Sequence, residues 1–239
     1  MKAYIHSFES LAALDGDGLR YAVFLNHCPL RCVYCHNPDT WLDSGACLEA
    51  SELVKKISRY KPYFKSGGGV TFSGGEPLLQ ADFICECSEL LQKEGVGYAL
   101  DTSGAVDITE SVRQAVERSE LVILDLKFPD DAKYKKYTGV GIAKVLNMLE
   151  LLEKLNKKTL LRTVIVPGIN DTEEQVSKYA EIAKRYKCIS NYELLAFHTM
   201  GFFKYRELGI ENPLENTQPL PEEKRAELQE YLNELLKTS

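Results

Sequence analysis

The sequence has no long apolar run and no excess of basic charge, and each absence excludes a class of protein. Its longer apolar stretches, such as Leu121–Leu124 and Val164–Val166, fall far short of the about 20 residues that cross a bilayer. The first residues, MKAYIHSFES, contain one Lys and no apolar segment, so we expect no secretory signal, no membrane attachment and a cytoplasmic location. Lys and Arg total 29 against 35 Asp and Glu, a net charge of −6, which argues against nucleic-acid binding.

Internal repeats, low-complexity tracts and Ser-rich linkers are also missing, and only the stretch 212–221 (NPLENTQPLP) reads as an extended loop. The 239 residues are 44% hydrophobic and 27% charged, which is typical of globular proteins. A chain of this size can bury about 70% of its surface on folding. We therefore predict a single domain over residues 1–239, with a core at 19–200 and a C-terminal loop and helix at 201–239.

Short apolar runs alternate with amphipathic stretches along the chain. The predicted strands are Arg20–Asn26, Gly69–Phe72, Val96–Leu100, Leu121–Leu126, Thr159–Val166 and Tyr192–Phe197. The predicted helices are Glu49–Tyr63, Gln80–Glu94, Ile108–Ser119, Ile142–Leu155, Thr172–Tyr186 and Pro221–Lys237. Thr172 and Gln175 have the spacing of a capping box at the start of one of these helices.

This alternation predicts an α/β fold with parallel strands joined by right-handed crossovers. Residues 4–8 are expected to pair with the first of these strands as a hairpin-like N-terminal extension. A closed eight-unit barrel usually needs about 250 residues, and the sequence offers only six βα units. We therefore predict a partial (β/α)6 barrel.

Three of the seven cysteines, Cys28, Cys32 and Cys35, form a C-x3-C-x2-C run directly after the first predicted parallel strand. Three thiolates on one loop can hold three corners of a four-iron cluster and leave one iron without a protein ligand. The alternatives are a structural zinc site, with His27 or His36 as the fourth ligand, and coincidental thiols. The remaining cysteines are interpreted as structural free thiols, namely Cys47, Cys85, Cys87 and Cys188.

Polar residues stand in or just after the predicted strands, where βα barrels place their chemistry. They are Asp101, Thr102, Asp125, Lys127, Arg162 and His198. Each has a structural alternative. The two Asp residues could cap helices, Lys127 could be solvated, Arg162 could pair with a carboxylate, and His198 could be a structural histidine. Their shared position at one edge favours a functional site.

The cysteine run, with an aromatic residue before its last Cys, resembles that of the radical S-adenosylmethionine (radical SAM) superfamily. The longer run from Cys32 to Trp41 (CVYCHNPDTW) is similar to the activating enzymes of glycyl radical enzymes. The resemblance extends from about Ile5 to His198. It includes IHSFES at 5–10, DG at 15–16, GGGVT at 67–71, SGGE at 73–76, LDT at 100–102, LDLK at 124–127 and VPG at 166–168.

This resemblance implies the cofactors and the residues that bind them. Cys28, Cys32 and Cys35 would bind a [4Fe–4S] cluster, with Tyr34 and Trp41 packed beside it. The residues that would contact S-adenosylmethionine are Tyr34, Ser73, Gly74, Gly75, Glu76, Asp101, Asp125, Lys127, Arg162 and His198. Asp101, Thr102 and Asp125 match a site for a monovalent cation, Na⁺ or K⁺, and their hard oxygen ligands suit such an ion.

Asp15 matches a residue that contacts the substrate peptide. The family often has Asp-Gly-Pro-Gly at this loop, and here Asp17 replaces the Pro, which leaves the loop less rigid. Only Cys47 lies between Cys35 and Glu76, so the resemblance implies one cluster and no ferredoxin-like insertion.

The resemblance implies an oxidoreductase of anaerobic metabolism. It would cleave S-adenosylmethionine reductively and use the 5′-deoxyadenosyl radical to abstract hydrogen from a glycine of a partner protein. Pyruvate formate-lyase is the partner that the resemblance favours, with flavodoxin or ferredoxin as reductant. The alternatives are activation of another glycyl radical enzyme, a radical enzyme that acts on a small molecule, and a metal module without catalysis. The last of these would leave the polar residues at the strand ends unexplained.

Overall fold

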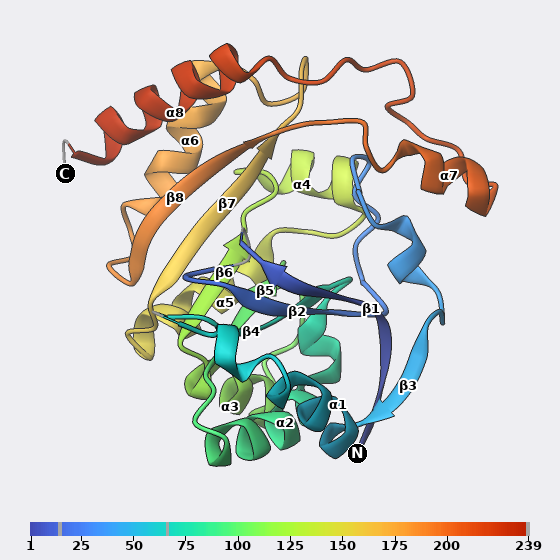
Figure 1. The fold of residues 1–239 in the computed structure, drawn as a ribbon. Coiled ribbons are helices and arrows are strands. Elements are labelled where there is room, and N and C mark those ends of the chain that lie inside the picture. Colours follow the sequence, from blue (N-terminus) through green and yellow to red (C-terminus); the bar gives the residue numbers. More distant parts are fainter. Residues whose placement is uncertain (14–15, 66, 238–239) are drawn as a thin grey trace.

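The computed structural model describes residues 1–13, 16–65 and 67–237, which contribute eight strands to one sheet (Figure 1). The order across the sheet is β3-β1-β2-β4-β5-β6-β7-β8. The strands are β1 (Lys2–Ala12), β2 (Arg20–Leu25), β3 (Ala46–Glu49), β4 (Gly69–Gly74), β5 (Tyr98–Thr102), β6 (Leu121–Asp125), β7 (Thr159–Ile165) and β8 (Ile189–Ala196). Because the first and last strands in this order do not pair, the sheet is open, which confirms the predicted partial barrel.

Neighbouring strands from β2 to β8 pair in parallel, so their carboxyl ends lie at the same edge of the sheet. The predicted strands match β2 and β4 to β8 within a few residues. The N-terminal extension is also confirmed, because β1 pairs antiparallel with β2. The sequence reading missed β3, a four-residue strand that pairs antiparallel with β1 and adds an edge to the sheet.

The helices in the described residues are α1 (Ala50–Ser58), α2 (Ala81–Lys93), α3 (Glu110–Arg118), α4 (Asp131–Thr138), α5 (Ala143–Lys154), α6 (Glu173–Ala183), α7 (Phe202–Leu208) and α8 (Glu222–Lys237). Three short 3₁₀ helices are η1 (Pro38–Trp41), η2 (Lys61–Tyr63) and η3 (Pro77–Gln80). Figure 1 shows α1, α2 and α3 together at one end of the sheet, and α6 and α8 together beside β7 and β8.

Two helices that the sequence reading missed, α4 and α7, are short and follow a strand end closely. Helix α4 buries only Tyr134 and Thr138, so its sequence shows little apolar periodicity. Its ends still carry local signals. The side chain of Asp130 accepts a hydrogen bond from Lys133 N, and Gly139 closes the helix with a φ of 84°.

The predicted capping box of α6 is only half formed. The hydroxyl of Thr172 accepts a hydrogen bond from the backbone N–H of Gln175 at 3.4 Å. The side chain of Gln175 is buried, and its Oε1 has no hydrogen-bond partner, so the reciprocal bond is not made. The box requires this Oε1 to accept from the backbone N–H of Thr172, and the Gln175 side chain is instead part of the buried interior.

One hydrophobic cluster runs from β1 to α8 and packs the outer, helix-facing side of the sheet against the surrounding helices. A smaller cluster on the other side of the strands consists of Ala99, Leu121, Ile123 and Leu160. Helix α8 covers the free edge of β8. The side-chain amide of Gln229 accepts from Leu194 N at 2.7 Å and donates to Tyr192 O at 2.9 Å. In the part of the chain that the structure describes, no helix is long and apolar enough to span a bilayer.

Candidate active site

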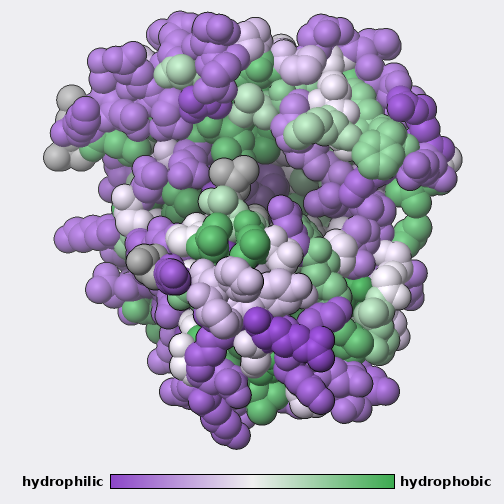
Figure 2. Space-filling model, viewed as in Figure 1, coloured by the Kyte–Doolittle hydropathy of each residue, from purple (hydrophilic) through white to green (hydrophobic). Residues whose placement is uncertain are grey.

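A cavity of about 300 Å³ opens at the carboxyl ends of the parallel strands. Figure 2 shows it as a hollow in the face of the molecule, with polar atoms in its depth and apolar side chains on part of its rim. The predicted site residues that line it are Cys28, Cys32, Tyr34, Cys35, Ser73, Gly74, Gly75, Asp101, Thr102, Asp125, Lys127 and Arg162. The fold thus brings together residues from the cysteine loop and from four strand ends.

Two predicted residues of the described part of the chain are not part of this lining. Glu76 and His198 lie beside the cavity and do not line it. Asp15 lies outside the described residues. Its neighbour Asp17, which replaces the Pro of the related loops, forms an ion pair with Lys158 at 2.9 Å.

The cysteine loop follows β2 and is held against α4 by two backbone hydrogen bonds. The N–H of Arg31 donates to Thr138 O at 2.7 Å, and the N–H of Val33 donates to Tyr137 O at 3.0 Å. These bonds satisfy the carboxyl end of α4 and fix the middle of the loop. Helix α4 therefore supports the loop that carries the three predicted cluster ligands.

The three thiols are free and largely withdrawn from solvent. Burial raises the pKa of Cys28 and Cys32 to about 12 and that of Cys35 to about 11. The metal-free thiols are therefore neutral at pH 7, and bound iron would displace their protons. Three cysteines around one cavity, one buried and two half-buried, fit a cluster in which each sulfur binds its own iron.

A mononuclear zinc site is not supported by the arrangement of these side chains. Among the described residues, no group of three or more His, Cys, Asp or Glu side chains is placed to hold a single metal ion. His27 instead contacts Asp43 at 2.6 Å, and His36 stacks on His198. Both rings that could have completed a zinc site are thus engaged elsewhere.

Two glycines allow β4 to end directly against the start of the cysteine loop. A Cβ on Gly75 would lie 2.1 Å from His27 O, and one on Gly74 would lie 2.3 Å from Leu25 N. Gly74 also has a φ of 111°, which L side chains rarely adopt. The glycines thus have a packing role in addition to lining the cavity.

Glu76 follows these glycines and has no exposed surface. Its carboxylate accepts hydrogen bonds from Thr102 Oγ1 at 2.6 Å and from Ser103 Oγ and N at 2.5 and 2.9 Å. It also accepts from Leu78 N at 3.1 Å. Burial raises the pKa of Glu76, and these hydrogen bonds oppose the rise. The structure therefore places Glu76 as a connection between the ends of β4 and β5 rather than in the cavity.

Charged groups on the cavity wall are paired with one another. Lys127 forms an ion pair with Asp125. Burial is the largest single effect and acts to lower the pKa of Lys127, but the charge and hydrogen bond of Asp125, together with the neighbouring Cys32 and Tyr134, outweigh it. The pKa is raised, so the ammonium stays charged. Ser73 Oγ donates to Asp101 at 2.6 Å.

Arg162 Nε donates to Glu193 Oε2 at 3.1 Å, which is the carboxylate pairing that the sequence left open as an alternative. Glu193 was not predicted as a neighbour of the site. The two residues are register partners on β7 and β8. Glu193 could be identified only from the register in which β7 and β8 pair, because the sequence pattern of neither strand reveals it.

His36 lines the cavity, although the sequence analysis named it only as an alternative zinc ligand. Its ring stacks on that of His198 with centroids 3.8 Å apart, and its Nε2 lies 3.2 Å from His198 O. Burial, with a smaller contribution from His198, lowers the pKa of His36 to about 4, and burial also lowers the pKa of His198. Both rings are therefore neutral at pH 7.

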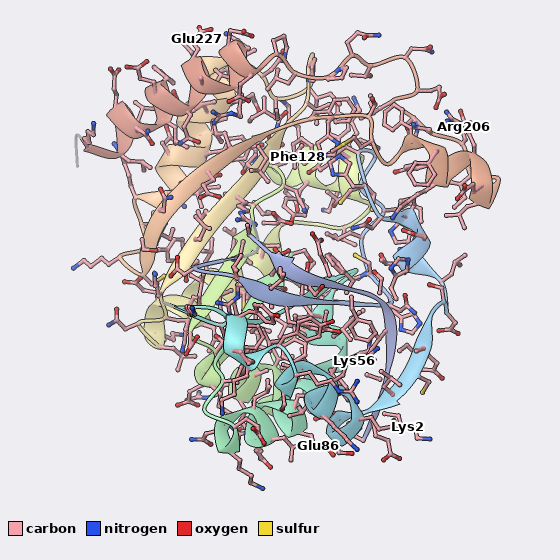
Figure 3. All side chains as sticks on the ribbon, in the orientation of Figure 1. Lys2, Lys56, Glu86, Phe128, Arg206 and Glu227 are labelled. Carbon is pink, nitrogen blue, oxygen red and sulfur yellow. The ribbon has the colours of Figure 1, made fainter. Side chains whose placement is uncertain are left out.

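Two buried polar atoms near the cavity have no hydrogen-bond partner, the hydroxyl of Tyr34 and Nδ1 of His198. Unpaired buried groups are costly, and a bound ligand can satisfy them. Tyr34 is 4% exposed, lines the cavity and packs edge-on against Phe128. Phe128 lies in the interior of the molecule (Figure 3). The unpaired hydroxyl of Tyr34 therefore fits a polar cofactor in the cavity, whereas His198 lies beside the cavity.

Comparison with known proteins gives the same assignment. The sequence pattern of the radical SAM superfamily matches residues 22–180. The pyruvate formate-lyase-activating enzyme of Clostridium pasteurianum is 43% identical over 97% of this chain and 98% of its own length. That of Staphylococcus epidermidis is 39% identical over 98% of this chain and 96% of its own.

Solved structures share the fold at lower identity. A domain of the pyruvate formate-lyase-activating enzyme of Bacteroides vulgatus gives a TM-score of 0.58 at 24% identity, covering 71% of this chain and 95% of its own. SuiB of Streptococcus suis bound to S-adenosylmethionine gives 0.69 at 15% identity, covering 89% and 46%. The chain therefore belongs to the radical SAM superfamily and, within it, to the family of the pyruvate formate-lyase-activating enzymes, and the superfamily's [4Fe–4S] cluster and S-adenosylmethionine are its cofactors.

Proposed function

We propose that this chain activates pyruvate formate-lyase by generating a glycyl radical on it. The observation that supports the proposal most strongly is that three cysteines, one buried and two half-buried, share one open cavity with the polar residues of the parallel strands. The near full-length similarity to activating enzymes supports the choice of partner. When bound, the reduced cluster supplies the electron that cleaves S-adenosylmethionine to methionine and a 5′-deoxyadenosyl radical, which takes a hydrogen atom from a glycine.

In this proposal, Cys28, Cys32 and Cys35 hold the cluster, and Ser73, Gly74 and Gly75 receive the amino group of S-adenosylmethionine. Tyr34 would offer its unpaired hydroxyl to the cofactor. His198 would offer Nδ1, for which a small shift of its ring toward the cavity is needed. Glu76 acts indirectly, since its carboxylate is fully used in holding Thr102 and Ser103.

Lys127 and Arg162 would neutralise the carboxylate of S-adenosylmethionine. Each already has a carboxylate neighbour, Asp125 for Lys127 and Glu193 for Arg162. Binding of the cofactor carboxylate therefore requires these cations to be shared or to exchange partners. If Lys127 turns to the cofactor, Asp125 loses its counter-charge.

A monovalent cation would restore that balance. We propose that Na⁺ or K⁺ binds between Asp101, Thr102 and Asp125. The hydroxyl of Thr102 donates to Glu76 and accepts from Gly104 N, which leaves one lone pair for a cation. Carboxylate and hydroxyl oxygens are hard ligands that suit such an ion.

The substrate peptide would enter through the open side of the cavity, with Asp15 as a contact. Glycine suits the reaction because no side chain hinders the approach to its α-carbon. The apolar lining, which includes Leu30, Val164 and Leu195, would exclude water from the reacting atoms. We further propose that residues 1–239 form one radical SAM domain in the cytoplasm, with core 19–200 and C-terminal loop and helix 201–239.

Flavodoxin or ferredoxin is the proposed reductant. Such a partner must reach the cluster from outside while the cavity mouth holds the peptide. Arg31 is exposed on the cysteine loop, and its Nη1 donates to Cys28 O at 2.8 Å. Lys135 and Lys136 are exposed on α4 beside that loop. This basic surface suits an acidic electron carrier.

The test is an anaerobic incubation of reduced protein with S-adenosylmethionine and pyruvate formate-lyase, followed by electron paramagnetic resonance (EPR). We expect a glycyl radical doublet, loss of the doublet in Cys32→Ser, and its retention in the matched control Cys47→Ser, whose thiol is exposed and does not line the cavity. Cofactor cleavage without a doublet would reject the partner. Cleavage stimulated by a small molecule instead of the lyase would favour the small-molecule alternative.

A further inference from the structure

The segment that follows the third cluster cysteine, residues 36–41, is held by a part of the chain that lies beyond the last strand. The hydroxyl of Tyr205 on α7 donates to Cys35 O at 3.0 Å. Gly201, at the start of α7, lies so close that a Cβ there would be 2.6 Å from His36 O. The ring of Trp41 meets that of Tyr205 edge-on. Helix α7 thus contacts this segment along its length, as its place beside η1 in Figure 1 also indicates.

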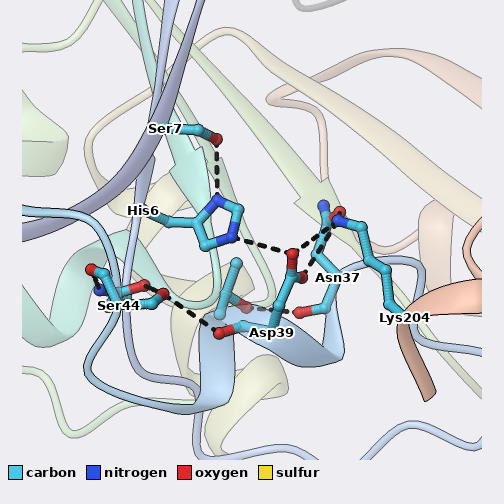
Figure 4. Close-up of polar contacts among 8 residues, drawn as sticks. His6, Ser7, Asn37, Asp39, Ser44 and Lys204 are labelled. Atoms are coloured by element: carbon cyan, nitrogen blue, oxygen red, sulfur yellow. Dashed lines mark hydrogen bonds and ion pairs between the residues drawn. The ribbon is translucent and has the colours of Figure 1, made fainter. Parts of the chain in front are cut away.

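One carboxylate, that of Asp39, joins this segment to both α7 and β1 (Figure 4). Lys204 Nζ on α7 lies 2.9 Å from Asp39 Oδ2 and also donates to Asn37 Oδ1 at 2.8 Å. His6 Nε2 on β1 lies 2.9 Å from the same Oδ2. A single Lys therefore contacts two residues of the segment, and a single Asp connects its own segment to two other parts of the fold.

The partners of this carboxylate are arranged to donate to it. Ser7 Oγ lies 2.8 Å from His6 Nδ1, and a serine hydroxyl that donates there leaves the ring proton on Nε2, facing Asp39. The side chains of Asp39 and Lys204 are only 24% and 19% exposed. A charge-assisted bond at this depth is stronger than a surface pair, and removal of one partner leaves the other partly buried and uncompensated.

None of the residues that form the pair lines the cavity. Asp39, Lys204 and His6 are absent from its wall, whereas Asn37 and His36 belong to it. The ion pair can therefore act on the cofactors only by setting the position of residues 35–37.

We propose that the Asp39–Lys204 ion pair is a positioning device that locks the segment after Cys35 to α7 and so holds the third cluster ligand in place. This inference rests on the proposed cluster ligands. It assigns a role in cluster binding to α7, which lies in the chain after all three cysteines and after the last strand. Asp39 and Lys204 are positioning residues and touch neither iron nor S-adenosylmethionine.

The test compares Lys204→Met with Lys204→Arg and with the matched control Arg206→Met. Arg206 lies on the same helix, is 66% exposed and pairs only loosely with Glu215 at 3.4 Å. Figure 3 shows it on the outer side of α7. Each protein is reconstituted anaerobically with iron and sulfide. The readouts are iron content, the rate of iron loss to a chelator, the EPR spectrum of the reduced cluster with and without S-adenosylmethionine, and the melting temperature of the metal-free protein.

We expect Lys204→Met to lose iron about tenfold faster than the wild type, as loss of one charge-assisted hydrogen bond in the segment that follows a cluster ligand implies. Its EPR signal should shift less when S-adenosylmethionine is added. Lys204→Arg should recover most of both properties, and Arg206→Met should match the wild type. If Lys204→Met does not fold, Asp39→Asn serves in its place, because it keeps the shape of the side chain and removes its charge.

The inference is overturned if Lys204→Met loses iron at the wild-type rate and gives the wild-type EPR spectra. It is also overturned if Arg206→Met changes both properties as much as Lys204→Met does. The proposed function fails separately. If the wild-type protein holds its cluster but makes no glycyl radical on pyruvate formate-lyase, the proposed partner is wrong. The iron-loss and EPR measurements still test the role of the ion pair in that case. A wild-type protein that cannot hold a cluster rejects both.

Discussion

Glu76 shows how a residue of a cofactor-binding motif can act without touching the cofactor. Its carboxylate is fully buried and accepts four hydrogen bonds, three of them from Thr102 and Ser103 at the end of β5. A buried carboxylate is tolerated when its oxygens are satisfied in this way. The Glu76 carboxylate therefore holds Thr102 and Ser103 in place, and both of these residues line the cavity.

We predict that Glu76→Gln lowers the free energy of unfolding by about 1–3 kcal/mol, since the amide nitrogen faces donors and leaves them unsatisfied. Urea denaturation of the metal-free protein measures the change. Glu181→Gln, on the exposed face of α6, is the control and should leave the unfolding midpoint unchanged. Equal stabilities of Glu76→Gln and wild type would contradict the role assigned to the carboxylate.

His36 gives the metal-free protein a pH-dependent stability. Burial and the neighbouring His198 lower the pKa of His36 to about 4 in the folded state, whereas an unfolded His titrates near 6.5. Above pH 6.5 the ring is neutral in both states and contributes no pH dependence. As the pH falls from about 6.5 to about 4, the unfolded state binds the proton first, so stability is lost over this window.

We predict that His36 accounts for a loss of up to about 3 kcal/mol of unfolding free energy across that window. Urea denaturation at several pH values, for wild type and His36→Gln, measures it. Between pH 6.5 and 4, the unfolding free energy of His36→Gln should fall less with pH than that of the wild type. Above pH 7, the unfolding free energies of both proteins should show no pH dependence from this position. Parallel profiles for the two proteins would show that another group controls the acid sensitivity.

At the scale of the element, α8 protects the edge strand of an open sheet. Strand β8 has β7 on one side only, and an uncovered edge invites pairing with another chain. Gln229 imitates a neighbouring strand, since its side-chain amide pairs with both Leu194 N and Tyr192 O. Arg225 adds a long contact to Leu194 O at 3.5 Å. Helix α8 thus supplies hydrogen bonds to the middle of the free edge of β8, at Tyr192 and Leu194.

We predict that Gln229→Ala destabilises the protein by about 1 kcal/mol, which is the usual value for a lost hydrogen-bonding side chain. It should also increase self-association on heating. Denaturation and light scattering together measure the two effects. Glu230→Ala, one position along on α8, is the control, because it removes an exposed side chain that does not reach the strand. If the two variants scatter light equally on heating, Gln229 does not prevent self-association through the free edge of β8.

The elements that could be predicted from sequence are those whose apolar pattern is long enough to be read alone. Strand β6 (LVILD) is a continuous apolar run because both its faces are buried, and it was found directly. Helix α7 has only seven residues, and its role depends on contacts with residues 35–41, far away in the chain. Strand β3 forms because β1 offers it a partner, which no local pattern shows.

The same distinction, between local sequence patterns and contacts across the fold, separates the site residues that could be predicted from those that could not. The cysteine run and the strand-end residues were readable because their spacing and position relative to the strands carry the information. Glu193 and the Asp39–Lys204 pair were not, because each depends on register or on a contact across the fold. The burial of Glu76 could not be seen either, since a motif gives residue types and not the direction in which a side chain points.

The whole molecule is acidic, with a net charge of −6, although the proposed reductant is expected to be an acidic carrier. Such a pair repels at long range, so a productive encounter needs a local basic surface near the cluster. Helix α4 provides one. Its Lys135 and Lys136 are exposed, and its carboxyl end bonds directly to the cysteine loop through Arg31 and Val33.

We predict that the double variant Lys135→Gln/Lys136→Gln is reduced severalfold more slowly by flavodoxin but at the wild-type rate by dithionite, a small reductant that needs no docking surface. Stopped-flow measurement of cluster reduction over a range of salt concentrations tests this. The wild-type rate with flavodoxin should fall as salt rises, because screening weakens the local attraction, and the variant should depend less on salt.

The matched control is Lys55→Gln/Lys56→Gln on α1, which lies at the other end of the sheet, and it should behave as wild type. If both double variants slow reduction equally, the effect belongs to the total charge and not to α4. If neither does, the reductant docks elsewhere, and the electron reaches the cluster by a path that does not cross this helix.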